Sequence, residues 1–297
     1  MNKKSSANHE EKRIKDLKIF QDPDPTLARI IIVGTWSQRH YDANKLLEIV
    51  TEAWPENTRV DFVITCGGFV NFPWPSNITI DKIDNINPYP ELINSLCDSA
   101  EPIIYNIIDK KIGNKLSGLT NYITLGLDSF SPQGYSIELV AFIDVNSGEI
   151  HWTGKSYPDN PQEGSLIRIN DMSTHFLNTR SGKAMILGCH DLKLFSNRGR
   201  AVAKSEWRIK AREDIDRLLI EEKPRIVLQH PHTTDSIRNW GTEISQLCYQ
   251  GDSIENFLSA GRYYNWGEPQ RSPLSDVLKS TKIGNSIDFV YESNQKV

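Results

Sequence analysis

A short apolar run ends in three side chains that are capable of chemistry: AMILGCHDLKLF, residues 184–195. The AMIL run has the length and composition of a buried strand. Cys189 follows it, with His190 and Asp191 next in the chain. A cysteine at the end of a strand can point its sulfur into a pocket, where a nearby cation makes the thiolate available. Three interpretations are open at this point: a nucleophile, a set of metal ligands, or an ordinary cysteine at a buried strand end.

Composition describes an ordinary globular protein. The chain has 297 residues, 38% of them hydrophobic, and a net charge of -4, so we expect no nucleic-acid partner. No segment approaches the roughly 20 apolar residues that span a bilayer, and no apolar stretch follows the charged N-terminus, so we expect no membrane association and no signal peptide. The four cysteines form no CxxC pair, which favours a reducing, cytoplasmic location.

Strands and helices alternate around this run. We predict strands at ARIIIVGTW (28–36) and VDFVITCGGF (60–69), with a helix from Asp42 to about Trp54 between them. Helices are also predicted over 202–221 and around 240–248. Further strands are predicted at IIYNII (103–108), NYITLGL (121–127), SIELVAFIDV (136–145), EIHWTG (149–154), RIVLQHPH (225–232) and SIDFVYE (286–292). Two sheets covered by helices would bury all these elements, which predicts a single α/β domain over 28–297 after a flexible tail over 1–27.

A lysine also stands just beyond a predicted strand. Lys155 follows the strand in HWTGKSYP, and a lysine and a cysteine at the ends of adjacent strands can lie within reach of each other. The alternative is a metal site that would use His190 and Asp191 together with His230 and His232 of QHPHTTD. Successive strand residues point to opposite faces, so His190 and Asp191 face one metal only if a loop begins there.

The order of these pieces resembles the nitrilase (carbon–nitrogen hydrolase) superfamily. GCHDLKLF resembles the nucleophile motif of that family, and SGEIHWTGKSYP resembles its lysine segment, with Lys155 34 positions before Cys189. The similarity covers about residues 28–250, and the region from about 250 departs from the usual ending. The resemblance implies a nitrilase-like α-β-β-α sandwich, no cofactor, and pairing into a possible homodimer.

The resemblance also implies a Glu–Lys–Cys triad. In it Cys189 would attack an amide or nitrile carbon, Lys155 would stabilise the developing charge, and a glutamate would act as general base. The glutamate of the family follows the second strand, but here that position is Gly67, and the next acidic residue after Asp61 is Asp81. Glu163 resembles in position a secondary glutamate of some members, and we predict that it partly substitutes as the base. The alternative substitute is His190 or a histidine of QHPHTT.

Three functions follow as hypotheses. The first is a divergent carbon–nitrogen hydrolase-like protein that acts on a small amide-type substrate through a cysteine nucleophile. The second is a catalytically inactive protein of the same fold that binds a ligand or a partner, and the third is a metal-dependent hydrolase with His and Asp ligands. We expect a small-molecule substrate or ligand, in contact with His190, His230, His232, Thr233 and Gly67.

Overall fold

The computed structural model describes residues 16–84, 89–197, 204–234, 237–264 and 271–293. One sheet has nine strands. In spatial order these are β1 (Leu17–Gln21), β14 (Ser286–Glu292), β2 (Leu27–Val33), β3 (Val60–Ile64), β5 (Thr120–Phe130), β6 (Ser136–Asp144) and β7 (Ile150–Gly154), with β4 (Val70–Asn71) beside β5 and β8 (Leu166–Ile167) beside β6. We call this sheet A.

The second sheet, sheet B, has five strands. Their order is β13 (Lys282–Ile283), β12 (Asn256–Ser259), β11 (Ile226–Gln229), β10 (Gly182–Leu187) and β9 (Phe176–Thr179). The pairs β10–β11 and β11–β12 are parallel. Strands β10, β11 and β12 contain runs of buried residues rather than strict alternations, as is usual for a sheet that is covered on both faces.

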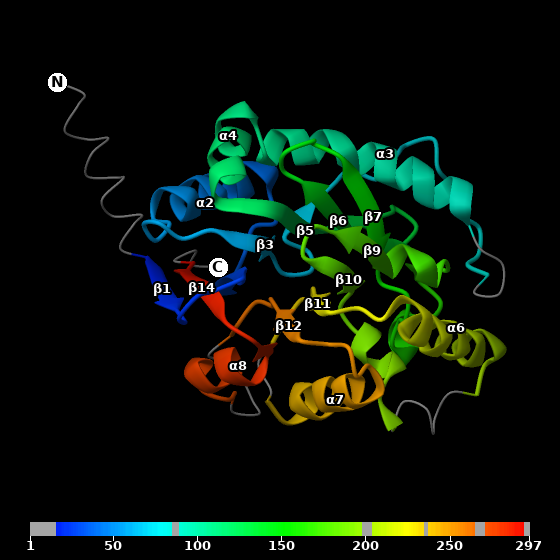
Figure 1. Ribbon diagram of the computed structural model, residues 1–297. Coiled ribbons are helices and arrows are strands. Elements are labelled where there is room, and N and C mark those ends of the chain that lie inside the picture. Colours follow the sequence, from blue (N-terminus) through cyan, green and yellow to red (C-terminus); the bar gives the residue numbers. More distant parts are fainter. Residues whose placement is uncertain (1–15, 85–88, 198–203, 235–236, 265–270, 294–297) are drawn as a thin grey trace.

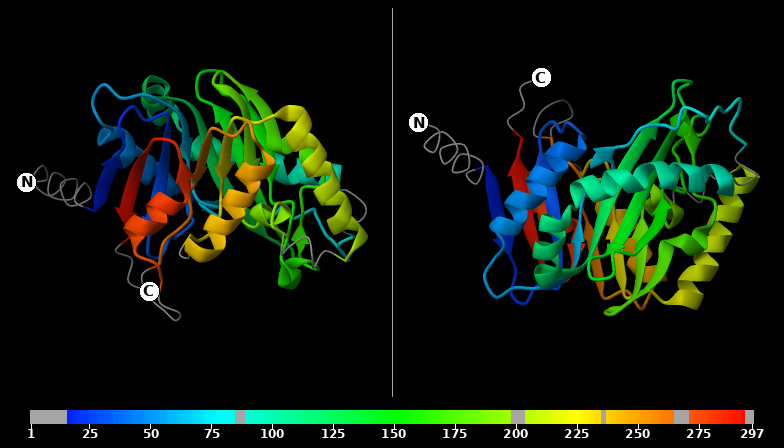
Figure 2. Two further views of the ribbon diagram at one scale, coloured as in Figure 1. Left: turned by 60° about the horizontal axis from the view of Figure 1, so that its bottom comes forward. Right: turned by 90° about the horizontal axis from the view of Figure 1, so that it is seen from above.

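Helices cover the outer face of each sheet. They are α2 (His40–Glu52), α3 (Pro90–Ile107), α4 (Lys110–Leu119), α6 (Glu206–Glu222), α7 (Ile237–Gln250) and α8 (Leu274–Ser280), with short 3-10 turns η1 (Asn160–Gln162), η2 (Met172–His175) and η3 (Asp191–Leu194). Figure 1 shows α2, α3 and α4 on one side of the strands and α6, α7 and α8 on the other, and Figure 2 shows the same layers from two further directions.

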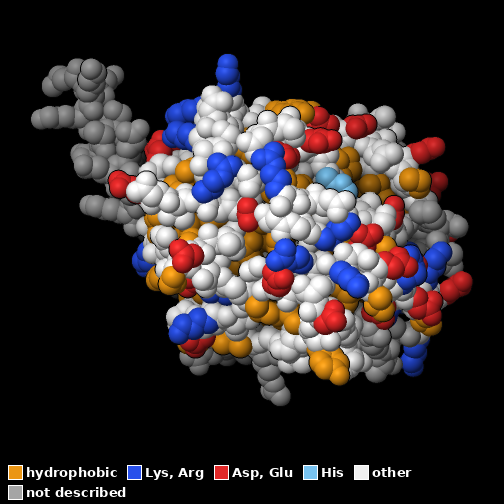
Figure 3. Space-filling view, in the orientation of Figure 1, with side chains coloured by type: hydrophobic (Ala, Val, Ile, Leu, Met, Phe, Trp, Pro, Cys, Tyr) orange, Lys and Arg blue, Asp and Glu red, His pale blue; other side chains and the backbone are white. Residues whose placement is uncertain are grey.

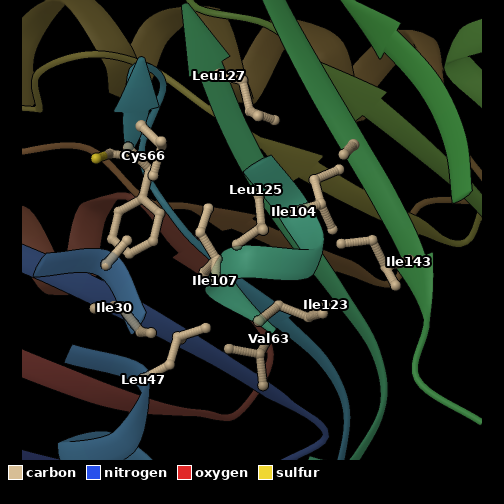
Figure 4. Packing of buried hydrophobic residues seen from close by; sticks show 14 of the residues in the cluster. Ile30, Leu47, Val63, Cys66, Ile104, Ile107, Ile123, Leu125, Leu127 and Ile143 are labelled. Carbon is tan, nitrogen blue, oxygen red and sulfur yellow. The ribbon is translucent and has the colours of Figure 1, made fainter. Parts of the chain in front are cut away.

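Three hydrophobic clusters correspond to the three interfaces between these layers. Figure 4 shows the outer cluster of sheet A, where Leu47 of α2 and Ile104 of α3 pack on strand residues such as Val63 and Leu125. A second cluster lies between the two sheets, and a third joins sheet B to α6 and α7. The predicted α-β-β-α sandwich is confirmed.

The strand periodicity decides what each side chain faces. In β6, Ile137, Leu139 and Ala141 belong to the cluster under the helices, whereas Val140 and Phe142 belong to the cluster between the sheets. Because side chains alternate along a strand, Glu138 lies on the face of sheet A that is turned toward sheet B.

Two predicted boundaries differ from the structure. Strand β1 lies within the segment 1–27 that was predicted as a tail, and it pairs antiparallel with β14; residues 1–15 lie outside the described residues. The segment 103–108 is helical rather than a strand, since α3 extends to Ile107. Its isoleucines at 103, 104, 107 and 108 have the spacing of a helix face, and a short apolar run by itself does not distinguish the two structures.

The region from about 250 contributes strands to both sheets, with β12 and β13 in sheet B and β14 in sheet A. Strand β14 pairs in parallel with β2 over seven residues and lies between β1 and β2 in sheet A.

On the face seen in Figure 3, acidic, basic and apolar side chains are intermingled rather than separated by charge. None of the helices in the described part of the chain has the length and apolarity to span a bilayer.

Candidate active site

The ends of two strands bring Lys155 and Cys189 to the same place. Lys155 directly follows β7 of sheet A, and Cys189 lies two residues beyond β10 of sheet B. Both side chains are buried, with 1% and 7% of their surface exposed. A lysine so deeply buried requires a compensating charge, because taking an ammonium group out of water is costly.

Asp191 ties the two strand ends together. Its Oδ1 accepts hydrogen bonds from the backbone amides of Ser156 (3.0 Å) and Tyr157 (2.8 Å), directly after Lys155. Its Oδ2 accepts a third from the amide of Gly188 (2.8 Å), next to Cys189. Asp191 is therefore a structural residue of the turn, fully buried and occupied by backbone amides.

Glu138 supplies the charge that faces Lys155. Nζ of Lys155 donates a 2.9 Å hydrogen bond to Oε1 of Glu138 and a 2.5 Å hydrogen bond to Oε1 of Gln162. Nε2 of Gln162 also donates to Oε1 of Glu138, at 3.1 Å. Burial lowers the pKa of Lys155, but the charges of Glu138 and Cys189 outweigh it, so that the pKa lies above its usual value and the ammonium form persists.

A second acidic residue, Asp128, stands opposite Glu138 on the neighbouring strand. The two are register partners in the β5–β6 pair. Nε2 of His232 donates a 2.7 Å hydrogen bond to Oδ2 of Asp128, while Nδ1 lies 3.6 Å from Oε2 of Glu138. Burial lowers the pKa of His232, but the hydrogen bond and the charge of Asp128, with a smaller contribution from Cys189, hold it well above its usual value.

Three groups with different chemistry converge at this point. A carboxylate oxygen of Glu138, the sulfur of Cys189 and a ring nitrogen of His232 lie within 4.8 Å of one another. The backbone amide of His232 also donates to the sulfur of Cys189, at 3.4 Å. Oε2 of Glu138 is buried and has no hydrogen-bond partner among the residues that the structure describes. The arrangement thus joins a thiol, a carboxylate with a free oxygen, an ammonium group and an imidazole.

Three solved structures are similar to this chain at low sequence identity. A mutant of an amidase of the nitrilase superfamily from Nesterenkonia AN1 matches with a TM-score of 0.47 at 12% identity, over 80% of this chain and 78% of that one. A carbon–nitrogen hydrolase from Helicobacter pylori G27 matches with a TM-score of 0.44 at 10% identity, over 92% and 83%. A glutamine-dependent NAD+ synthetase from Acinetobacter baumannii matches with a TM-score of 0.41 at 12% identity, over 82% and 38%.

The four-layer order of this chain is the one that the resemblance to the nitrilase superfamily implied. The chain has a nitrilase-like fold. No family model matches its sequence, and no curated protein does.

Gly67 lies beside this cluster, at the position where the nitrilase resemblance implies the general base. A Cβ atom there would stand 2.6 Å from the carbonyl oxygen of His230 and 3.3 Å from both the amide nitrogen and Nδ1 of His232. The space that a side chain at 67 would need is thus filled by the segment after β11. The carboxylate of the site comes from Glu138 on β6 instead.

Glu163 is not brought to Lys155. Its Oε1 accepts a 2.8 Å hydrogen bond from Nε1 of Trp207, and its Oε2 lies 3.2 Å from NH2 of Arg208, in an ion pair. The neighbouring residue Gln162 contacts Lys155 instead. The role of substitute base that was predicted for Glu163 therefore finds no support in its contacts, which are with Trp207 and Arg208.

Most of the other residues that were predicted to contact a substrate lie outside the cluster around Cys189. His230 is 1% exposed, and its Nδ1 binds the carbonyl oxygen of Thr65 at 2.8 Å, so the ring is part of the interior. Nδ1 of His190 lies 3.6 Å from Oδ2 of Asp159. Thr233 forms a β-bridge with Arg262. Of the four predicted histidine and threonine contacts, only His232 is in the cluster around Cys189.

The predicted metal ligands do not converge in the described part of the chain. Asp191 is occupied by three backbone amides, and the ring of His230 binds Thr65. Only His232 of the predicted set belongs to the group of donor atoms around Cys189, and its companions there are Glu138 and Cys189. The ligand set proposed from the sequence is therefore wrong.

Sequence reasoning missed Glu138, Asp128 and Gln162. A signal for the first two was present: each is an acidic residue within a strand that is buried along most of its length, in SIELVAFID and NYITLGLDSF. A charge at such a position is rarely buried unless it is paired. Gln162 had no comparable signal.

Proposed function

We propose that the chain is a cysteine-dependent hydrolase that acts on carbon–nitrogen bonds of small amide-type substrates. The observation that carries the proposal is the contact of Glu138 with Lys155 beside Cys189, within the 4.8 Å cluster of donor atoms. It supplies the carboxylate whose absence at Gly67 favoured an inactive protein.

Each group has a role that its surroundings support. Cys189 is the nucleophile, and Glu138 is the general base that takes the thiol proton with its unpartnered Oε2. The buried ammonium of Lys155 stabilises the negative charge that develops on the carbonyl oxygen. The carbon–nitrogen bond then breaks, the amine leaves, and water hydrolyses the thioester on Cys189.

The proposal is tested with a panel of short aliphatic and aromatic carboxamides, by the release of ammonia. We expect turnover by the wild-type protein, none by Cys189→Ala, and a decrease of about 100- to 10,000-fold for Glu138→Gln. Cys248→Ala is the matched control, because Cys248 lies on α7 outside the cluster. Turnover that persists in Cys189→Ala would contradict the proposal, as would turnover that is lost when metal ions are removed by a chelator.

A further inference from the structure

Two consecutive glycines make room for a histidine in this site. A Cβ atom on Gly68 would stand 2.5 Å from Oδ2 of Asp128 and 3.0 Å from Cδ2 of His232, and its backbone has a φ of +57°. Gly67 leaves the corresponding space for the backbone and Nδ1 of His232. Both glycines are therefore needed for the Asp128–His232 pair to occupy its place beside Cys189.

The pair is oriented toward the reacting atoms. Asp128 is buried, and its Oδ2 holds Nε2 of His232 at 2.7 Å. This fixes the ring, so that Nδ1 is the nitrogen left to face Glu138 and the thiol of Cys189. The side chain of His232 is 24% exposed, whereas those of Lys155 and Glu138 are 1% and 12% exposed. Of these three side chains, that of His232 is the most exposed to solvent.

The charges of the site also favour a proton on His232. Asp128 and Glu138 are two carboxylates, and Lys155 neutralises one of them through its 2.9 Å contact with Glu138. An imidazolium at His232 neutralises the other, in agreement with its raised pKa. In the resting site, the carboxylate of Glu138 can accept a proton and the imidazolium of His232 can donate one.

We infer that His232 is a second catalytic residue, the general acid that protonates the departing nitrogen, and that Asp128 is its positioning residue. The inference rests on the proposed function. It assigns to two side chains the two proton transfers of amide cleavage: Glu138 takes the proton of the thiol, and His232 supplies the proton of the amine.

The protons balance over one cycle. In acylation the sulfur of Cys189 forms a bond to the carbonyl carbon, its proton passes to Glu138, the carbon–nitrogen bond breaks, and the nitrogen takes the proton of His232. In deacylation the neutral His232 removes a proton from water, the water oxygen bonds to the thioester carbon, and the carbon–sulfur bond breaks. The leaving thiolate recovers its proton from Glu138, so both groups return to their starting states.

This assignment narrows the substrate class to carboxamides. An amide nitrogen leaves only with a proton, because the amide anion is a very poor leaving group, so an acid placed beside the thiol accelerates its departure. An activated ester with a p-nitrophenolate leaving group needs no such proton. Loss of the acid should therefore affect the two substrates differently.

The test compares butyramide with p-nitrophenyl butyrate, which deliver the same acyl group to Cys189. For His232→Gln we expect kcat/KM for butyramide to fall by about 100- to 10,000-fold, while the rate of Cys189 acylation by the ester falls by less than about tenfold. Acylation is measured in a single turnover by intact-protein mass spectrometry, and amide cleavage by ammonia release. Asp128→Asn keeps the shape of the pair, and we expect a smaller loss in the same direction.

Two controls separate the possible outcomes. His151→Gln removes a half-buried histidine whose ring binds the carbonyl of Thr174, and we expect both substrates to react as with wild type. Equal losses for amide and ester in His232→Gln would indicate a merely structural role and would overturn the inference. If neither substrate acylates Cys189 in the wild-type protein, the proposed function itself fails.

Discussion

Asp191 binds the backbone of Tyr157 at 2.8 Å and so connects the segment after the candidate nucleophile to the segment after the candidate lysine. The same carboxylate also accepts the amides of Ser156 and Gly188. The relative position of Cys189 and Lys155 thus depends on a residue whose carboxylate binds backbone amides. Its location two residues after Cys189 explains why the local motif is CHD rather than a lone cysteine.

Replacement of this carboxylate should therefore destabilise the fold as well as the site. Asp191→Ala leaves three buried amides without an acceptor, and we expect a loss of at least about 3 kcal/mol in the free energy of unfolding. Urea denaturation measures it. Asp252→Ala, at an exposed position, is the control and should change stability by less than about 0.5 kcal/mol. A loss below 1 kcal/mol for Asp191→Ala would show that water or a backbone shift replaces the carboxylate.

Gly67→Glu tests whether the base has moved. If the family position were merely vacant, this substitution would raise activity. We expect it to abolish turnover of any amide that the wild-type protein hydrolyses. Even a Cβ at position 67 meets the carbonyl oxygen of His230 at 2.6 Å, so the larger side chain would displace His232. Gly118→Glu is the matched control, since a Cβ at that exposed helix position meets nothing within 4 Å. An active Gly67→Glu protein would refute the assignment of Glu138.

The two halves of the candidate site differed in how far the sequence could predict them. Cys189 and Lys155 each follow a strand within a local motif, so a few neighbouring residues identify both. Glu138 and Asp128 face each other only because of the register of β5 and β6. They meet His232 only because sheet B lies on that face. Period-two alternation places both acids between the sheets, but it does not give the register or the place where the sheet ends meet.

The same distinction applies to the fold. Long runs such as ARIIIVGTW carry enough β-branched residues to predict a buried strand, and β2 is found there. The run IIYNII was ambiguous because its isoleucines fit a helix face as well as a strand, and its place under sheet A within α3 is a tertiary outcome. The pairing of β1 with β14 joins segments more than 260 positions apart, which local patterns do not reveal.

Removal of one partner from the ion pair of Arg29 and Asp288 should destabilise the fold strongly. They form a fully buried ion pair, with Nε to Oδ1 at 2.7 Å and NH2 to Oδ2 at 3.1 Å, and the guanidinium also donates to the carbonyl of Ser259 at 2.8 Å. We expect Asp288→Ala to lower the free energy of unfolding by about 3–5 kcal/mol, because it leaves a buried charge unpaired.

Urea denaturation at neutral pH measures this effect. The matched control is Glu221→Ala, which removes the exposed partner of Arg217, and we expect a change of at most about 1 kcal/mol. If the two variants lose similar stability, the buried pair is not what fastens β14 to β2. The double variant Arg29→Met with Asp288→Leu removes both charges and should recover part of the loss.

Acid should destabilise the protein through His230. Burial lowers the pKa of this histidine to about 4, from 6.5 for a free side chain. The unfolded chain therefore binds a proton below about pH 6.5 that the folded chain refuses, so the associated stability is present above that pH and is lost as the pH falls toward 4. Between pH 7 and pH 5 the loss from this residue is about 2 kcal/mol.

Urea denaturation of wild type and His230→Gln at both pH values isolates this contribution, since the glutamine amide can still donate to the carbonyl of Thr65 but does not titrate in this range. We expect the decrease in unfolding free energy between pH 7 and pH 5 to be smaller in the variant by about 2 kcal/mol. The exposed His40 provides the control, and His40→Gln should leave the wild-type decrease unchanged. Equal decreases in wild type and His230→Gln would mean that the folded protein accepts the proton, with water reaching the ring through a local opening.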